Sequence, residues 1–153
     1  MSDTPRRRAI VEAFQTRLGA IAVADGFRTD AGLHIFLQET PALGDDDPDI
    51  AIALLTRADE SSWQGEHVML RLPVEIQAVA KDSLDAPWLL VEDLLADIKT
   101  AVELEDRTLG GLVRRQIERG ATVTVERAEG STVVGLSITY VAPYTERWGH
   151  PEV

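Results

Sequence analysis

Cysteine is absent from the 153 residues of this chain. A disulfide framework, a zinc site built on thiolates and a cysteine nucleophile are therefore excluded, and a reducing compartment suits the composition. A chain of this length can bury one sizeable core without disulfide support, so we expect a single domain.

Long apolar runs are also missing. No stretch reaches the roughly eighteen apolar residues that indicate a membrane-spanning helix. The arginines at positions 6–8 are not followed by the continuous apolar segment of a signal peptide. We therefore expect a soluble protein that is not exported and does not contact membranes.

The sequence lacks the common motifs of catalysis and metal binding. The three histidines, His34, His67 and His150, form neither an i, i+4 pair nor an HExxH motif. A Gly-x-Ser-x-Gly elbow is absent, and Gly110–Gly111 is followed by Leu-Val instead of the Lys-Ser/Thr of a Walker A motif. We therefore predict no catalytic residue, no cofactor and no metal ion.

Basic residues are few relative to acidic ones, with 15 against 26 and a net charge of -11. The excess lies in residues 44–106, which hold sixteen acids and four bases. Such a field repels phosphate backbones, which disfavours specific binding of DNA or RNA but suits a surface past which DNA slides. Thirteen of the bases are arginine. This favours bidentate contacts with carboxylates on partner chains, although genomic GC bias would give the same preference.

The densest acidic stretch is GDDDPD at residues 44–49. The spacing of its aspartates matches the first three ligands of an EF-hand calcium loop. However, Ile50 stands where that loop needs glycine, and Thr56 where it needs glutamate. A solvated turn before a strand is the better interpretation.

An amphipathic helix is predicted near the N-terminus. Thr4 and Pro5 suit an N-cap and the first helical position, and apolar residues then recur at helical spacing, which indicates a helix over residues 5–20. Its first turn carries three arginines: Arg6, Arg7 and Arg8. The helix dipole disfavours positive charge there, so these side chains form either a solvated face or a contact with an acidic neighbour.

Three strands are predicted next, at residues 33–38, 50–56 and 68–80. In the third strand every even-numbered position is apolar, which indicates one buried face. Because it exceeds the usual strand length, we expect it to bend at Pro73 or to project as an arm. The polar loop before it contains an isolated tryptophan, Trp63.

The C-terminal half is predicted to contain two helices and a hairpin. One helix begins near Asp85 and Pro87 and has a wide apolar stripe, and a shorter one runs from Thr108 to a left-handed cap at Gly120. Alternation then predicts two strands around a turn near Glu129 and Gly130. We expect an α+β domain over residues 1–144, with a mixed or antiparallel β-sheet of about five strands and helices packed on one face, followed by a tail at 145–153.

Several stretches together resemble the tail terminator proteins of long-tailed bacteriophages, also called tail completion or minor tail U-like proteins. They are RRRAIVEAFQTRLGAI, IAIALL, HVMLRLPVEIQAVA, WLLVEDLLADIKTAV, LGGLVRRQIERG and VVGLSITYVAPYTERWGHP. The resemblance covers essentially the whole chain and lies in element order and pattern, without a strict motif. The acidic stretch and the long third strand depart from the family's pattern.

The resemblance implies a structural virion protein without enzymatic activity, assembled in the bacterial host cytoplasm. It would form a hexameric ring at the head-proximal end of the tail tube, stop polymerisation of the tube protein, and present a surface to a head-completion or connector protein. A radius of gyration of about 15 Å gives a subunit about 40 Å across. Six such subunits leave a bore through which DNA would pass without specific binding.

Two sets of residues are expected to act in such a ring. The bore or one ring face would carry Asp45, Asp46, Asp47 and Asp49. Contacts with neighbouring subunits or partner proteins would come from Arg6, Arg7, Arg8, Trp63, Arg114, Arg115, Tyr144 and Trp148. The alternatives are a related neck, head-completion or tail tube protein, a small cytosolic enzyme whose site is assembled from scattered residues, and an adaptor that binds one host protein without forming rings.

Overall fold

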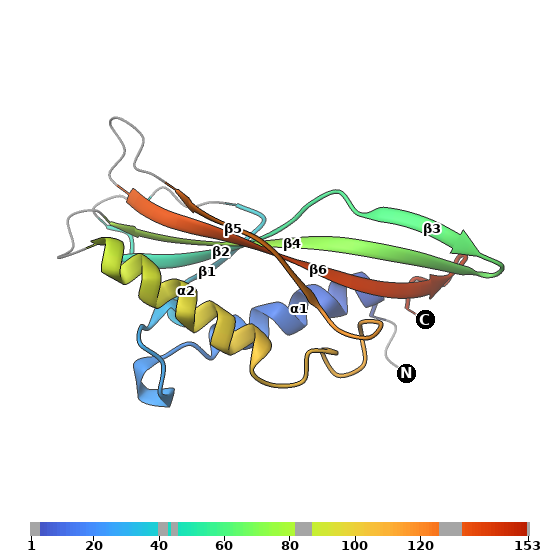
Figure 1. Ribbon diagram of the computed structural model, residues 1–153, viewed down its shortest axis with the longest axis horizontal. Coiled ribbons are helices and arrows are strands. Elements are labelled where there is room, and N and C mark those ends of the chain that lie inside the picture. Colours follow the sequence, from blue (N-terminus) through green and yellow to red (C-terminus); the bar gives the residue numbers. More distant parts are fainter. Residues whose placement is uncertain (1–3, 40–42, 44–45, 82–86, 126–132, 153) are drawn as a thin grey trace.

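Two long antiparallel strands, β4 (His67–Lys81) and β6 (Val133–Arg147), form the centre of the structure (Figure 1). The computed structural model describes residues 4–39, 43, 46–81, 87–125 and 133–152. The strands β4 and β6 pair along their whole length, from His67 opposite Arg147 to Lys81 opposite Val133. This ladder is the frame to which the other elements attach.

Within the described residues the sheet has six strands and is mixed. The remaining strands are β1 (Ile35–Leu37), β2 (Ile50–Thr56), β3 (Glu60–Gln64) and β5 (Glu118–Val125). The order is β1-β2-β4-β6-β5, with β3 paired to the N-terminal part of β4. Only the β1–β2 pair is parallel among these described strands.

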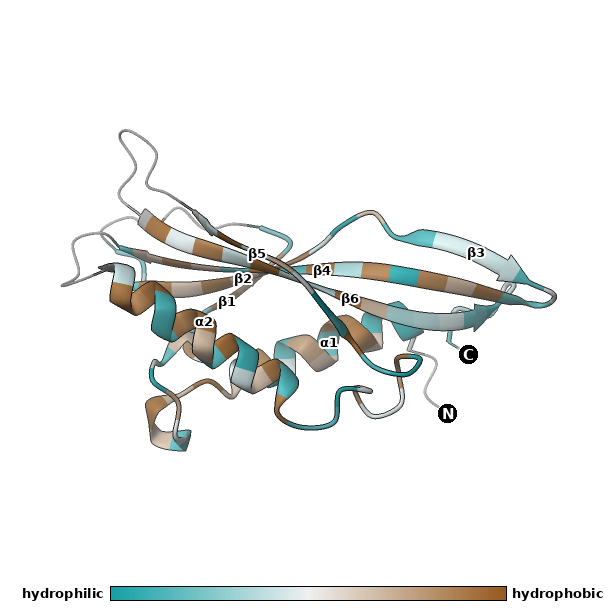
Figure 2. Ribbon diagram, viewed as in Figure 1, coloured by the Kyte–Doolittle hydropathy of each residue, from teal (hydrophilic) through white to brown (hydrophobic). Residues whose placement is uncertain are grey.

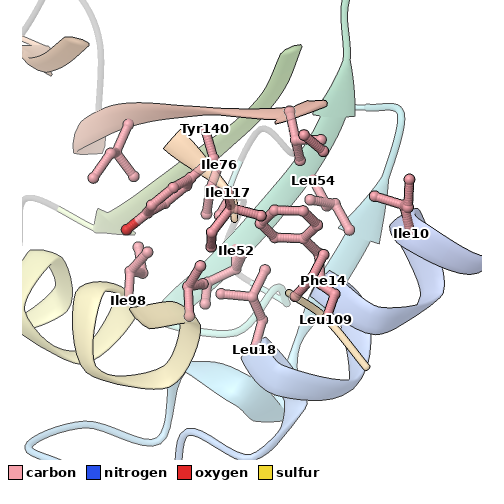
Figure 3. Packing of buried hydrophobic residues seen from close by; sticks show 14 of the residues in the cluster. Ile10, Phe14, Leu18, Ile52, Leu54, Ile76, Ile98, Leu109, Ile117 and Tyr140 are labelled. Atoms are coloured by element: carbon pink, nitrogen blue, oxygen red, sulfur yellow. The ribbon is translucent and has the colours of Figure 1, made fainter. Parts of the chain in front are cut away.

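Two helices, α1 (Arg6–Gly19) and α2 (Pro87–Glu103), cover one face of the sheet (Figure 1). Every even-numbered residue of β4 from Val68 to Ala80 is buried and belongs to the main core cluster. Phe14 of α1 and Ile98 of α2 point into this cluster towards Tyr140 of β6 (Figure 3). The predicted α+β fold with helices on one face is therefore confirmed.

The alternation of side chains along β4 explains why the helices lie on that face. Its odd-numbered residues include Arg71, Glu75 and Gln77, and the colouring in Figure 2 alternates accordingly along the strand. Successive strand residues point to opposite faces, so only the even-numbered face can bury apolar surface along the whole strand. The other face has a small cluster near its C-terminal end, formed by Leu43, Ala51, Val79 and the partly buried Phe36.

The helix α1 begins one residue later than predicted. Pro5 occupies the N-cap position with φ -56° and ψ 139°, so Thr4 lies outside the helix. Proline is compatible with this extended conformation because its ring holds φ near -65°. Between α1 and β1 the chain forms two short 3₁₀ turns, Val23–Asp25 and Ala31–Leu33. The second turn replaces the start of the strand predicted at residues 33–38.

The predicted third helix between Thr108 and Gly120 is wrong. Four residues of this segment have left-handed backbone conformations: Leu109 (φ 52°), Gly110 (71°), Gly111 (85°) and Arg115 (65°). A right-handed helix cannot contain them. The Asp106 carboxylate stabilises the turn instead, because it accepts hydrogen bonds from the backbone N–H groups of Thr108 and Gly110.

Gly120 lies in β5 instead of ending a helix. A Cβ atom at this position would come within 3.0 Å of the Thr139 carbonyl oxygen. The register of β5 against β6 shifts between Arg119 and Thr122, so the glycine allows a close approach of two backbones at an irregular part of the ladder. The two strands of the predicted hairpin are present as β5 and β6. Asp85, predicted near the start of a helix, and the predicted turn near Glu129 and Gly130 lie outside the described residues.

The segment predicted as a loop between residues 57 and 65 contains the strand β3. It pairs with β4 from Glu60 opposite Arg71 to Gln64 opposite His67. β4 itself continues through Pro73, which pairs with Val141 of β6. The outer part of this ladder extends beyond the N-terminal end of α1 (Figure 1). We call this part the arm; it consists of β3, residues 67–72 of β4 and residues 142–147 of β6.

β6 also continues three residues past the predicted boundary at residue 144. The chain then turns back, with a β-bridge between Arg147 and His150. The Pro151 carbonyl oxygen accepts a hydrogen bond of 2.8 Å from the backbone N–H of Arg6. The end of the predicted tail therefore lies against the first turn of α1.

Candidate interaction surfaces

All three tryptophans of the chain are exposed. Trp63 on β3 is 72% exposed, Trp148 is 59% exposed, and Trp88 in the first turn of α2 is 68% exposed. The backbone N–H of Trp148 donates to the Glu66 carbonyl oxygen, which places it at the end of the arm. Although Trp88 is an apolar residue at the start of α2, its side chain lies outside the core. Exposed tryptophans are typical anchors of protein interfaces.

Tyr144, in contrast, is not available as a surface anchor. Its side chain is 1% exposed and belongs to the main core cluster, because its partner in β4 is Leu70 on the buried face. Burial raises the pKa of Tyr144 to about 12, and the negative charges of Glu146 and Asp59 act in the same direction. The assignment of Tyr144 to a partner contact is therefore corrected.

The three arginines of α1 differ in their surroundings. Arg6 is bound through its backbone to the C-terminal segment, as described above, and Arg8 forms an i, i+4 ion pair of 2.8 Å with Glu12. Arg7 and Arg8 are exposed. They border a groove of about 320 Å³ between α1 and the edge of the sheet. We call it the arginine groove; it is lined by Pro5, Arg7, Arg8, Val11, Gln38 and Thr56.

The acidic stretch lies at the other end of β2. Asp45 is outside the described residues, whereas Asp46, Asp47 and Asp49 are exposed. We call residues 46–49 the acidic turn. The Lys81 ammonium group donates to the Asp47 carbonyl oxygen at 2.7 Å and lies 3.5 Å from the Asp49 carboxylate. The backbone N–H of Lys81 also donates to the Asp49 carbonyl oxygen, so the turn is tied to the end of β4.

Arg114 and Arg115 occupy the irregular segment before β5. The backbone N–H of Arg114 donates to the Pro143 carbonyl oxygen at 2.6 Å, and its guanidinium lies 2.8 Å from the Met69 sulfur. Arg114 therefore attaches this segment to the base of the arm. Arg115 is exposed and is the better candidate for a contact with another chain.

A polar cluster that sequence reasoning missed joins α2, β5 and β6. Glu103 accepts hydrogen bonds from the Tyr140 hydroxyl at 2.6 Å and from two nitrogens of Arg119 at 2.5 and 3.0 Å. Burial would raise the pKa of Glu103, but the hydrogen bonds from Arg119 and Tyr140 outweigh it and lower the pKa. Burial and the Glu103 charge raise the pKa of Tyr140 far above its usual value.

This cluster borders an open, polar cavity of about 560 Å³ between α2 and β5. Its other lining groups include Arg107, Gln116 and Glu118. The carboxylate, guanidinium and phenol of the cluster are bonded to one another, so the arrangement holds α2 against the sheet. No local pattern could have indicated it, because the three residues lie 16 to 37 positions apart.

Replacing Glu103 by glutamine is expected to lower the free energy of unfolding at pH 7 by about 1–2 kcal/mol, because glutamine cannot form the charge-assisted bonds to Arg119. Since folding lowers the pKa of Glu103, its charge stabilises the protein above pH 4.5, the value of the free side chain. The difference between the wild type and E103Q should therefore shrink as the pH falls through the folded-state pKa. Urea unfolding at pH 7, 5 and 3.5 measures it.

Glu105→Gln is the matched control, because Glu105 lies two residues further on and is exposed. This variant should unfold like the wild type at each pH. A difference between the wild type and E103Q that is equally large at pH 7 and pH 3.5 would contradict the assigned ionic contact.

Other kinds of site find little support in the described part of the chain. No group of three or more histidine, aspartate or glutamate side chains there could hold a metal ion. Among the described helices, none is long and apolar enough to cross a membrane. No protein-family model matches the sequence, and no curated protein matches it significantly.

Proposed function

We propose that this chain is a structural virion protein of a long-tailed phage that acts by assembly and not by catalysis. Six copies would close into a ring on the head-proximal end of the tail tube, end polymerisation of the tube protein and provide the surface that a head-completion protein binds. The observation that carries the proposal is the arm, which presents Trp63 and Trp148 to the surroundings.

The arm has the properties of a surface that another chain covers. All five residues of β3 are exposed, and β3 is an edge strand whose only described partner is β4. Edge strands are sites where further chains add, and exposed aromatic side chains contribute a large part of the binding energy when they become buried. Contacts with a neighbouring subunit or with the tube would bury both features.

The distribution of charge supports a passage for DNA. The acidic excess of residues 44–106 and the exposed acidic turn would repel a phosphate backbone. A wall of this kind would let DNA pass during ejection without forming contacts that must then be broken.

The proposal is tested by measuring assembly directly. Light scattering coupled to size-exclusion chromatography should give a species near six subunits of 16.8 kDa, about 101 kDa, and negative-stain images should show rings. Because closure can require a template, the protein is also added to tail tubes prepared from the phage or prophage that encodes it. We expect rings at one end of each tube and shorter tubes when the protein is present during polymerisation.

The double variant Trp63→Ala/Trp148→Ala tests the role of the arm. It should unfold at the same urea concentration as the wild type, because both side chains are exposed, yet fail to cap tubes. A monomer that neither binds tube ends nor changes tube length would overturn the proposal. A one-to-one complex with a single host protein would favour the adaptor instead.

A further inference from the structure

We infer that the arginine groove of one copy binds the acidic turn of a second copy. The inference rests on the proposed ring and names the contact that would close it. The groove combines an apolar floor with two exposed guanidinium groups, and the turn combines a proline with exposed carboxylates. The guanidinium groups of the groove are thus complementary in charge to the carboxylates of the turn, and the apolar floor can contact the proline.

The arginine groove lies beside the C-terminal ends of β1 and β2. Gln38, the residue after β1, has φ 60°, and its backbone N–H donates to the Leu54 carbonyl oxygen of β2 at 2.8 Å. Its side-chain amide is fixed by two hydrogen bonds to Thr56, one to the hydroxyl at 2.9 Å and one from the backbone N–H at 3.1 Å. Gln38 and Thr56 line the groove from the sheet, and Pro5 and Val11 line it from α1 and its N-cap.

The acidic turn has a matching chemistry and a fixed shape. Pro48 stands between Asp47 and Asp49, so an apolar ring is flanked by carboxylates. Proline fits an apolar groove without losing conformational freedom, and carboxylates form bidentate pairs with guanidinium groups. Lys81 donates hydrogen bonds to the carbonyl oxygens of Asp47 and Asp49, so the turn is already ordered and loses little conformational entropy on binding.

The position of the arginines at the start of α1 adds a second electrostatic reason. The N-terminus of a helix carries a partial positive charge, which makes three consecutive arginines unfavourable there. A carboxylate placed beside them interacts favourably with both the guanidinium groups and the helix end. An acidic occupant therefore offsets the positive charge that the Arg8–Glu12 ion pair leaves at this helix end.

The acidic turn of the same copy cannot fill the groove. The turn precedes β2 and the groove lies at its other end, so the seven residues of β2 separate them by about 20 Å. Hydrogen bonds fix both ends of β2: Lys81 bonds to Asp49 just before the strand, and Gln38 bonds to Thr56 at its last residue. A contact between different patches of two copies is heterologous, and such contacts generate rings when the rotation closes.

This contact gives the aspartates a role different from lining the bore. Aspartates in the bore would affect DNA passage and leave the ring intact. Aspartates in the groove of a neighbour would be needed for assembly itself. The two roles therefore predict different results when the charges are changed.

Exchange of charges tests the contact. One variant, Arg7→Glu/Arg8→Glu, reverses the groove, and another, Asp46→Lys/Asp47→Lys, reverses the turn. We expect each alone to need at least about tenfold more protein for half-maximal assembly, because like charges then face each other. An equimolar mixture of the two should assemble as well as the wild type, since reversed grooves meet reversed turns and unchanged grooves meet unchanged turns. Native mass spectrometry should then find equal numbers of both subunits in each ring.

The controls separate this inference from the proposed function. Arg28→Glu reverses an exposed arginine outside the groove and the arm and should assemble like the wild type, and urea unfolding checks that every variant folds. Assembly of Arg7→Glu/Arg8→Glu at the wild-type concentration, or a loss that the mixture does not repair, would overturn the contact while leaving the ring proposal standing. Repair of the mixture into open filaments would support the contact and count against the ring. Wild-type protein that stays monomeric in solution and on tail tubes would overturn both.

Discussion

Replacement of Asp97 by alanine is expected to lower the free energy of unfolding by about 3 kcal/mol. The Asp97 side chain is 3% exposed, and its carboxylate accepts hydrogen bonds from the backbone N–H groups of Arg28 and Thr29 at 3.0 and 2.8 Å. The Thr29 hydroxyl donates a third, also 2.8 Å long. Alanine would leave these donors without their acceptor, and each unsatisfied buried donor costs about 1 kcal/mol or more.

The effect should be visible in urea unfolding followed by circular dichroism at neutral pH. Asp93→Ala is the matched control, because Asp93 lies one helical turn earlier, is 46% exposed and sits 3.6 Å from the Arg28 guanidinium. Exposed ion pairs of this kind contribute at most about 1 kcal/mol. Equal losses in the two variants would show that the hydrogen bonds from Arg28 and Thr29 do not anchor α2 to the chain before β1.

Replacement of Phe14 by alanine is expected to cost about 4 kcal/mol, the largest effect of any substitution considered for this protein. The ring is completely buried between α1 and the sheet, and its centroid lies 6.0 Å from that of Tyr140 at an interplanar angle of 45° (Figure 3). Alanine would remove both the buried apolar area and this aromatic contact, and a cavity would remain.

Two companion variants define the origin of that loss. Phe14→Leu keeps most of the volume and should cost clearly less than alanine. Phe27→Ala removes an aromatic ring that is only partly buried against the same cluster, and should cost about 1–2 kcal/mol. A loss for Phe14→Ala no larger than that for Phe27→Ala would contradict the packing of α1 against β6.

The elements with strong apolar periodicity could be predicted from the sequence. The first helix, β2 and β4 lie within one or two residues of the expected ranges. For the helix and β4 the signal is a buried face that repeats about every 3.6 or every two residues, whereas for β2 it is a run that is apolar on both faces. The length of β4 predicted either a bend at Pro73 or a projecting arm, and the strand continues through Pro73 into the arm.

The error at residues 108–120 shows the limit of periodicity. Leu109, Val113 and Ile117 recur every four residues as in a helix, and all three are indeed buried. The chain reaches these positions through turns, since the backbone N–H groups of Val113 and Ile117 bond to the carbonyl oxygens of Thr108 and Arg107. Spacing indicates which residues are buried but not the backbone path between them.

The strand β3 was missed for a different reason. Its sequence, Glu-Ser-Ser-Trp-Gln, has no apolar alternation because all five residues are exposed. It is a strand because the N-terminal part of β4 has backbone groups to pair on the side away from β6, and the preceding residues 60–64 pair with them. The pairing depends on the backbone groups of the neighbouring strand, so the sequence of residues 60–64 does not indicate it.

The sequence by itself determined the fold class, the buried face of the sheet and the uneven charge, since these follow from composition and from spacing between near neighbours. Only the tertiary structure decided that Tyr144 is buried, that Glu103 binds Arg119 and Tyr140, and that Arg7 and Arg8 border a groove with Gln38. Each of these contacts joins elements far apart in the chain. Their meeting depends on strand register and on how the helices lie on the sheet, which no local pattern of residues specifies.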